Sequence, residues 1–211
     1  MMTRCRAGDG SGLAPANRRS ERRRAIIAAA EALFLEQGYD STSLAAIVKQ
    51  SGGSLATLYE LFGNKQGLLH AIVEAFTEDD VCPVYAGCED QAPAQLVRQY
   101  AHRLYAHFTS PRAVALKRIA ITEAMRDPAF ASSLYQGVHL PAVKELAENF
   151  AGLNETGRAV IDDPLAAAEL FFAIVISDAR LRVLAQGDAG HLDEAALDWR
   201  LAPFLSFFKF R

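Results

Sequence analysis

The 211-residue sequence is poor in cysteine and has no long apolar run. Its three cysteines, Cys5, Cys82 and Cys88, are odd in number and provide no basis for a disulfide framework. The longest mainly apolar stretch, 165–177, is shorter than the roughly 20 residues that a membrane-spanning helix needs. Residues 1–16 lack the continuous apolar core of a secretory signal. These absences predict a cytoplasmic protein that does not associate with a membrane.

Catalytic and cofactor signatures are also missing. The sequence contains no phosphate-binding P-loop, no dinucleotide-binding glycine pattern, no Gly-x-Ser-x-Gly motif and no His-Glu-x-x-His zinc motif. Cys82 and Cys88 lie in a segment with proline and glycine and have no clear second pair of ligands, which favours free cysteines over a metal or redox site. We therefore expect no enzymatic activity, no cofactor and no metal site, and leave a redox role of the two cysteines open.

Charge is distributed unevenly along the chain. The net charge is −3, yet residues 1–70 contain nine Lys/Arg against six Asp/Glu, and residues 71–211 contain thirteen against nineteen. A basic N-terminal part joined to an acidic body is compatible with nucleic-acid binding by the basic part. A charge asymmetry of this size also arises by chance, so it supports nucleic-acid binding but does not establish it.

Helical periodicity extends along the chain, and no segment shows convincing strand alternation. A flexible tail is expected at 1–17. The arginine-rich run 18–24 then leads into an Ala/Leu-rich helix, which Gly38 ends as a C-terminal cap. Later helices are expected at 65–80, 95–109, 111–126, 129–150 with a kink or break at Pro141, 164–184 and 193–208.

The segment 42–62 has the pattern of a helix-turn-helix. Thr42 or Ser43 caps one short helix, the turn is 51–53, and Ser54 caps a second helix. In such a motif the second helix lies in the major groove of DNA. The cap at Ser54 leaves backbone N–H groups pointing outward, where a phosphate binds readily. The pattern therefore predicts a DNA-binding head.

These residues resemble the DNA-binding domain of the TetR family of bacterial transcriptional regulators. The matching positions are Gly38-Tyr39, Thr42-Ser43, Ile47, Ser54, Thr57-Leu58-Tyr59, Phe62, Lys65 and Leu68-Leu69. The resemblance implies an all-α fold with a three-helix helix-turn-helix DNA-binding domain at 18–70. It implies a helical ligand-binding and dimerisation domain at 71–211.

The resemblance also implies DNA-backbone contacts by Tyr59 and Lys65, which set register and affinity. Each of these roles has a structural alternative: Tyr59 as a packing residue, the Thr42/Ser43 site as a helix cap alone, and the arginines as an arm surrounded by solvent.

Three residues depart from the family pattern: Leu55 and Leu61 on the second helix of the motif, and Gly53 in the turn. Leu61 is expected to cost a phosphate contact, whereas Leu55 can meet a thymine methyl group. The expected DNA-binding residues are Arg18, Arg19, Arg22, Thr42, Ser43, Ser54, Leu55, Ala56, Thr57, Tyr59 and Lys65.

The last two helices carry apolar residues on more than one face, which indicates burial against a partner. The TetR resemblance implies that these helices form a four-helix bundle in a homodimer. Twofold symmetry then separates the two recognition helices by about 34 Å and predicts a palindromic operator in double-stranded DNA. The expected interface residues are Phe171, Ile174, Leu181, Trp199, Phe204, Phe207 and Phe208.

The resemblance further implies a cavity for a small-molecule effector among the middle helices. These helices combine aromatic residues with a few polar groups, as ligand pockets do. The same residues also have structural alternatives: the aromatic residues as part of the hydrophobic core, His107 as a core or surface histidine without a ligand, and Arg118 as an ion-pair partner of Glu123. The expected lining residues are Tyr100, Arg103, Leu104, His107, Phe108, Arg118, Thr122, Met125, Tyr135 and Phe172.

Three functions are compatible with these patterns. The favoured one is a ligand-responsive regulator, most simply a repressor, that binds its operator as a homodimer and is released by the effector. The second is a helical small-molecule carrier or enzyme with a merely structural head. The third is a DNA-binding adaptor that a protein partner controls.

Overall fold

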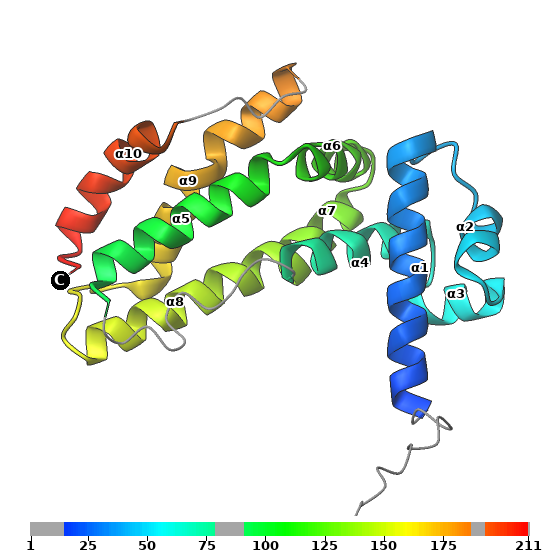
Figure 1. Cartoon of the computed structure of the whole chain (residues 1–211), viewed down its shortest axis with the longest axis horizontal. Coiled ribbons are helices and arrows are strands. Elements are labelled where there is room, and N and C mark those ends of the chain that lie inside the picture. The colour runs from blue at the N-terminus through cyan, green and yellow to red at the C-terminus, as the bar shows by residue number, and fades with distance from the viewer. Residues whose placement is uncertain (1–14, 79–90, 187–192, 211) are drawn as a thin grey trace, which may run out of the picture. The chain divides into compact units, whose positions relative to one another are not determined.

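The computed structural model describes residues 15–78, 91–186 and 193–210. Every element in these ranges is helical, which confirms the predicted all-α class (Figure 1). The chain forms two compact units, one ending at Leu68 and the other beginning at Leu69. This boundary lies inside α4 (Lys65–Glu78), slightly before the expected one at 70/71. None of the helices within the described residues is long and apolar enough to cross a membrane.

Two sequence expectations fall wholly or partly outside the described residues. Residues 1–14 of the expected tail are not described, and neither are Cys82 and Cys88. Residues 15–17, which were also expected in the tail, instead begin α1 (Pro15–Gln37). A proline is well tolerated there because the first turn of a helix has no partners for its N–H groups.

The N-terminal unit is a small helical head. α1 contacts α2 (Leu44–Ser51), and α2 contacts α3 (Leu55–Phe62), as Figure 1 shows. Apolar residues at helical spacing on α1 meet apolar residues of α2 and α3 and of the start of α4, and this burial stabilises the head. The buried residues are Ile26, Ile27, Ala29, Ala30, Leu33, Phe34, Ile47, Leu58, Phe62 and Leu68.

The turn between α2 and α3 depends on two glycines. Gly52 and Gly53 have φ angles of 75° and 102°, a backbone region that side chains with a Cβ rarely adopt. The Arg22 guanidinium lies against the turn and donates a hydrogen bond from Nη1 to the Ser51 carbonyl over 3.2 Å. Gly53, a departure from the family pattern, is therefore explained by the backbone geometry of this turn.

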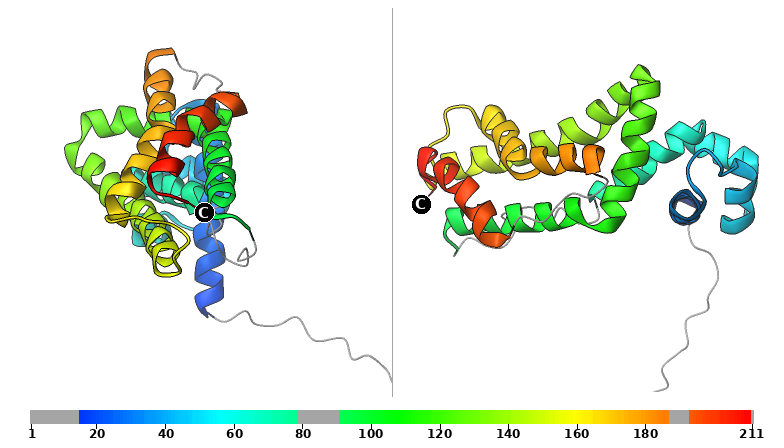
Figure 2. Two further views of the ribbon diagram at one scale, coloured as in Figure 1. Left: turned by 90° about the vertical axis from the view of Figure 1, so that its left-hand side faces the viewer. Right: turned by 90° about the horizontal axis from the view of Figure 1, so that it is seen from above.

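The C-terminal unit contains α5 (Pro93–Thr109), α6 (Pro111–Arg126), α7 (Pro128–Leu134), α8 (Leu140–Glu155), α9 (Pro164–Gln186) and α10 (Glu194–Phe207). α8 packs along α9, and α5 contacts both α9 and α10, as Figures 1 and 2 show. An aromatic cluster of Phe150, Phe171, Phe204 and Phe210 fills the space between these helices. Edge-to-face and offset aromatic pairs of this kind stabilise a core beyond their buried area.

A single π-helical turn, Tyr135–His139, separates α7 from α8. The Leu140 N–H bonds to the Tyr135 carbonyl, which is one residue farther back than in an α-helix. The sequence predicted a kink or break at Pro141, but the interruption precedes that residue. Pro141 has no N–H and its ring crowds the preceding turn, so it is accommodated at the start of α8, directly after the wider π turn.

Candidate functional site

The exposed face of α3 presents the residues that the sequence predicted to read DNA. Ser54 caps the helix: its Oγ accepts a hydrogen bond from the Thr57 N–H over 3.1 Å and lies 3.0 Å from Thr57 Oγ1. Leu55 is 42% exposed and Tyr59 is 51% exposed, whereas Leu58 between them is fully buried. Ala56 is also exposed. One face of α3 thus anchors the helix in the head, and the other is open to a partner.

Ser43 and Thr42 have different roles at the start of α2. Ser43 Oγ accepts from the Ala46 N–H over 3.1 Å, so Ser43 is the cap and is itself exposed. Thr42 is only 2% exposed, and its hydroxyl donates to the carbonyls of Gly38 and Leu33 at the end of α1. The prediction that Thr42 contacts DNA is therefore corrected. Its hydroxyl satisfies carbonyl groups that the end of a helix leaves without partners.

Lys65 is tied into the head. Its ammonium donates to the carbonyl of Tyr39 and, over 3.4 Å, to that of Asp40. The same Nζ lies 4.4 Å from the Tyr39 ring centroid, a cation–π distance. The matching Lys65 and Tyr39 therefore hold the loop after α1 against the start of α4. A phosphate contact by Lys65 stays a prediction.

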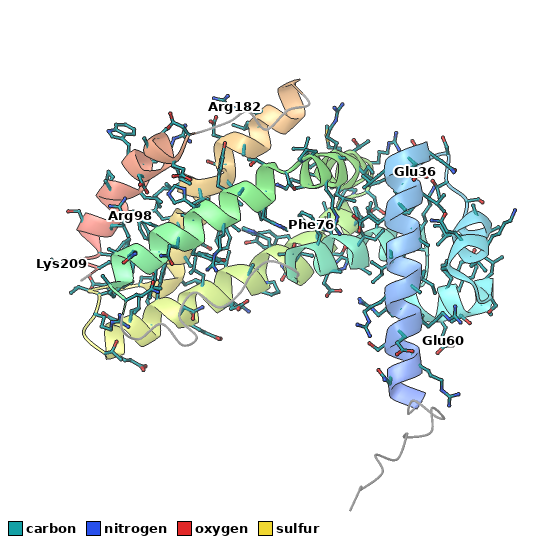
Figure 3. The ribbon with its side chains drawn as sticks, viewed as in Figure 1. Glu36, Glu60, Phe76, Arg98, Arg182 and Lys209 are labelled. Carbon is teal, nitrogen blue, oxygen red and sulfur yellow. The ribbon has the colours of Figure 1, made fainter. Side chains whose placement is uncertain are left out.

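The expected arginine arm forms the first turns of α1. Arg19 pairs with Glu60 over 3.2 Å, and Arg22 contacts the turn at Ser51 (Figure 3 labels Glu60). Arg18 is exposed. Because the Arg19–Glu60 pair is well exposed, it contributes little stability and can exchange for a phosphate partner. Contact between these arginines and DNA stays a prediction.

A cavity of about 230 Å³ lies within the C-terminal unit. The structure brings four of the expected residues to its wall: Tyr100, Leu104, Phe108 and Phe172. The sequence pattern did not predict the other lining residues, because their burial depends on α4, α6 and the π turn packing together. These residues are Val73, Phe76, Thr77, Ala113, Leu116, Lys117, Ala120, Ile121, Leu134, Val138, His139 and Ala142. The spacing of Val73, Phe76 and Thr77 was the available signal on α4, since they share one helix face.

Six expected pocket residues do not line this cavity, and the prediction is corrected for them. Arg103, Arg118 and Thr122 are exposed on their helices, as are Met125 at 81% and Tyr135 at 49%. The sixth, His107, stacks on Phe76, with ring centroids 4.0 Å apart (Figure 3 labels Phe76). Phe76 lines the cavity, whereas His107 lies behind it.

The residues expected at the dimer interface differ in how deeply they are buried in the protomer. Phe171 and Phe204 are 0% and 3% exposed inside their own unit, so they are corrected from interface to core. Ile174 and Phe208 are partly buried against that core. Leu181, Trp199 and Phe207 are 67%, 79% and 75% exposed, which is unusual for side chains of their size.

Ion pairs fasten α10 to α5 and α9. Asp198 Oδ1 lies 3.2 Å from Arg98 Nη1 and 3.1 Å from His102 Nε2 (Figure 3 labels Arg98). Burial acts to raise the pKa of Asp198, but hydrogen bonds from His102 and Arg98 and their positive charges outweigh it and lower the pKa. Asp178 pairs in the same manner with Arg182 and Arg200.

Comparison with known proteins agrees with this arrangement. Residues 26–72 match the family described as "Bacterial regulatory proteins, tetR family". Residues 95–206 match the family described as "AefR-like transcriptional repressor, C-terminal domain". The two matches cover the helix-turn-helix head and most of the unit that holds the cavity.

Individual relatives support the same assignment. The HTH-type transcriptional repressor ComR of Escherichia coli K12 is 32% identical over 80 residues, which are 37% of this chain and 38% of ComR. A TetR-family regulator structure from Mesorhizobium loti MAFF303099 matches with a TM-score of 0.76 and 25% identity, over 90% of this chain and 98% of that one. The flavonoid-responsive regulator FrrA matches with a TM-score of 0.65 and 29% identity, over 90% and 95%. The chain belongs to the TetR family of bacterial transcriptional regulators.

Proposed function

We propose that this regulator is a repressor that binds a palindromic operator as a homodimer and is released by a small-molecule effector. The proposal rests on the course of α4. This helix begins at Lys65 in the head and continues into the C-terminal unit, where Val73, Phe76 and Thr77 form part of the cavity wall. A ligand that moves this wall acts on the helix that leads to the DNA-binding residues.

The exposed face of α3 supports the DNA-binding step. The exposed Leu55 presents an apolar side chain and the half-buried Thr57 a hydroxyl group, the two kinds of group that distinguish bases in the major groove. Tyr59 and the α1 arginines are suited to phosphates, which position a protein without reading sequence. Ser43 and Ser54, which cap short helices, add backbone N–H groups at both helix starts.

The exposed apolar side chains of α9 and α10 support dimerisation. Leu170 and Leu181 are exposed on α9 with the half-buried Ile174 at helical spacing between them, and Trp199 and Phe207 are exposed on α10. Two such helices from each protomer form four helices whose apolar faces are removed from water together. Burial of Trp199 alone is a large apolar contribution to such an interface.

Release by an effector is a shift between two populations. The ligand lowers operator affinity only if it binds the released form more tightly than the DNA-bound form. FrrA, whose name describes a response to flavonoids, is similar over 90% of this chain. That likeness supports a small-molecule effector here over control by a protein partner.

Selection of bound duplexes from a random DNA pool tests the first half of the proposal. We expect an enriched palindrome with half-sites about one helical turn apart, and analytical ultracentrifugation should give two protomers per duplex. If no sequence is enriched and binding disappears as the salt concentration rises, sequence-specific recognition is contradicted.

A panel of compounds tests the second half of the proposal. Each compound is measured by thermal shift and by its effect on the affinity for the selected duplex. Thermal stabilisation without any change in duplex affinity would instead favour the adaptor alternative.

A further inference from the structure

The cavity contains a polar group that the fold does not use. Tyr100 on α5 is only 4% exposed, and its ring stacks on Phe171 with centroids 5.5 Å apart. It lines the cavity, yet its hydroxyl has no hydrogen-bond partner among the residues that the structure describes. A hydroxyl that borders an apolar cavity and is not used by the surrounding described residues is available to a ligand.

The other polar residues of the wall already make internal contacts. Thr77 Oγ1 donates to the Val73 carbonyl over 2.9 Å. Lys117 Nζ donates to the Phe108 carbonyl over 2.6 Å and lies 3.7 Å from the centroid of the same ring. His139 meets the edge of Phe172 at 6.0 Å. The rest of the wall is apolar, and Tyr100 adds a hydroxyl group that no printed contact of these side chains engages.

The electrostatic surroundings keep the Tyr100 hydroxyl protonated. Burial is the main cause that raises its pKa to about 12, the charge of Glu145 adds to the effect, and Arg103 opposes it. A protonated phenol can donate a hydrogen bond, so an acceptor group on a ligand complements it. Glu145 lines a second hollow of about 220 Å³, which shares Thr77, Val138 and Ala142 with the cavity. This carboxylate and the apolar residues of the wall disfavour an anion beside Tyr100, and the Lys117 ammonium in the wall is already held by the carbonyl and ring of Phe108.

We infer that the cavity binds an uncharged, largely aromatic molecule with one acceptor oxygen, to which the Tyr100 hydroxyl donates a hydrogen bond. The inference rests on the proposed function and deepens it by naming the chemical class of the effector. A cavity of about 230 Å³ is smaller than most drug-binding pockets, which favours a compact ligand of about two rings.

Four two-ring probes of nearly equal shape test the ligand class. Benzophenone carries the acceptor, and diphenylmethane lacks it. Diphenylacetate is an anion, and benzhydrylamine is a cation. We expect benzophenone to bind about five-fold more tightly than diphenylmethane, the effect of one neutral hydrogen bond, and both charged probes to bind more weakly than benzophenone. Isothermal titration calorimetry on the full-length protein measures the four affinities.

Two matched variants test the residue. Tyr100→Phe removes one hydroxyl from the wall, and Tyr135→Phe removes one from an exposed side chain that does not line the cavity. We expect Tyr100→Phe to abolish the preference for benzophenone and leave the affinity for diphenylmethane unchanged, with Tyr135→Phe behaving as wild type. The ligand-free Tyr100→Phe protein should melt no lower than wild type, because the hydroxyl has no hydrogen-bond partner within the described part of the chain. A preference that persists in Tyr100→Phe, tighter binding of either charged probe, or no binding by any probe would overturn the inference.

Operator release is measured separately, so the two proposals can fail independently. If benzophenone binds through Tyr100 and the affinity for a selected duplex does not change, the release mechanism fails and the ligand class stands. If the protein selects a palindromic duplex but the probes show no dependence on the Tyr100 hydroxyl, the ligand class fails and DNA recognition stands.

Discussion

His70 and Gly137 approach so closely that the glycine could not be replaced without moving the histidine. His70 Nε2 on α4 lies 3.1 Å from the Ser133 carbonyl oxygen, which accepts the hydrogen bond. A Cβ atom at Gly137 would lie only 2.6 Å from that same nitrogen. The π turn that contains Gly137 also supplies Val138 and His139 to the cavity wall. This contact therefore connects α4 to the turn on which part of the ligand site is built.

A double-mutant cycle at these positions should show that the effect of Gly137→Ala depends on His70. Gly137→Ala alone should leave the free energy of unfolding unchanged or lower it by less than about 1 kcal/mol, because the new methyl displaces the His70 imidazole and breaks its hydrogen bond, which offsets the gain in helix propensity. In a His70→Ala background the clash is absent, and the same substitution should stabilise by about 0.5–1 kcal/mol, since alanine favours helix over glycine. Urea unfolding of the four proteins measures this coupling. Equal effects of Gly137→Ala in both backgrounds would contradict the steric explanation.

Loss of the Lys65 ammonium should weaken the head itself. Lys65→Met keeps the aliphatic stem but removes the donors to the Tyr39 and Asp40 carbonyls and the cation–π contact. We expect the free energy of unfolding to fall by about 1.5–3 kcal/mol, the usual range for hydrogen bonds to a charged group. Lys49→Met, on an exposed position of α2, is the control and should stay within about 0.5 kcal/mol of wild type. Equal thermal stability of the two variants would show that Lys65 has no structural role.

Substitutions on the α3 face should separate affinity from sequence preference. Tyr59→Phe removes an exposed hydroxyl and should weaken binding to all duplexes by a similar factor, because phosphate contacts carry no sequence information. Thr57→Ala should shift the bases selected at one position of each half-site. Thr57→Ser keeps the hydroxyl beside Ser54 and is the control for the cap. Duplex selection with each variant measures the profiles, and identical shifts for Tyr59→Phe and Thr57→Ala would argue against this division.

A charge on the exposed apolar face of α9 and α10 should produce monomers. Trp199→Arg or Phe207→Arg places a charge on a side chain that is 79% or 75% exposed in one protomer, so folding of the protomer should be little affected. The apolar contact between protomers would be lost, and a buried charge would oppose association. Met125→Arg, at a position 81% exposed on α6, is the matched control. Analytical ultracentrifugation reads the outcome; dimers that persist in both α10 variants would place the interface elsewhere.

The acid dependence of stability should include a contribution from Asp198. Its pKa is lower in the folded protein than its ordinary value of 3.8, so it binds fewer protons than in the unfolded chain. Its stabilisation is therefore present above that ordinary value and is lost as pH falls through the folded pKa. Asp198→Asn should flatten the decline of melting temperature with falling pH in this range, whereas Asp162→Asn, at an exposed site, controls for removing one carboxylate. A wild-type acid profile in Asp198→Asn would contradict the assignment.

The helix-turn-helix was predictable because its signals are local. A serine cap needs only its own hydroxyl and an N–H group three residues later, which is the geometry found at Ser43 and Ser54. Thr42 has the same chemistry as Ser43 and precedes it directly, yet its hydroxyl bonds to α1 carbonyls. That choice depends on where α1 ends in space, so no pattern within 42–62 could distinguish the two residues.

The apolar helices pose the opposite problem. Phe171 and Phe172 are adjacent in sequence, but one lies in the core and the other also lines the cavity. Phe204 and Phe207 are similarly close, and one is buried while the other is exposed. Periodicity identifies a helix and its faces, but each face becomes core, cavity or surface only according to the helices that pack against it.

The sequence by itself therefore determined the helical class, the capped helix-turn-helix and the family, because these rest on residue types a few positions apart. The tertiary structure decided which residues those helices enclose. It brought Val73 and Phe76 of α4 to Tyr100 of α5 and Val138 of the π turn around one cavity. Among the residues that the structure describes, it gave the Tyr100 hydroxyl no hydrogen-bond partner. Burial and hydrogen-bond satisfaction are properties of packed surfaces, so they exist only once segments distant in the chain have met.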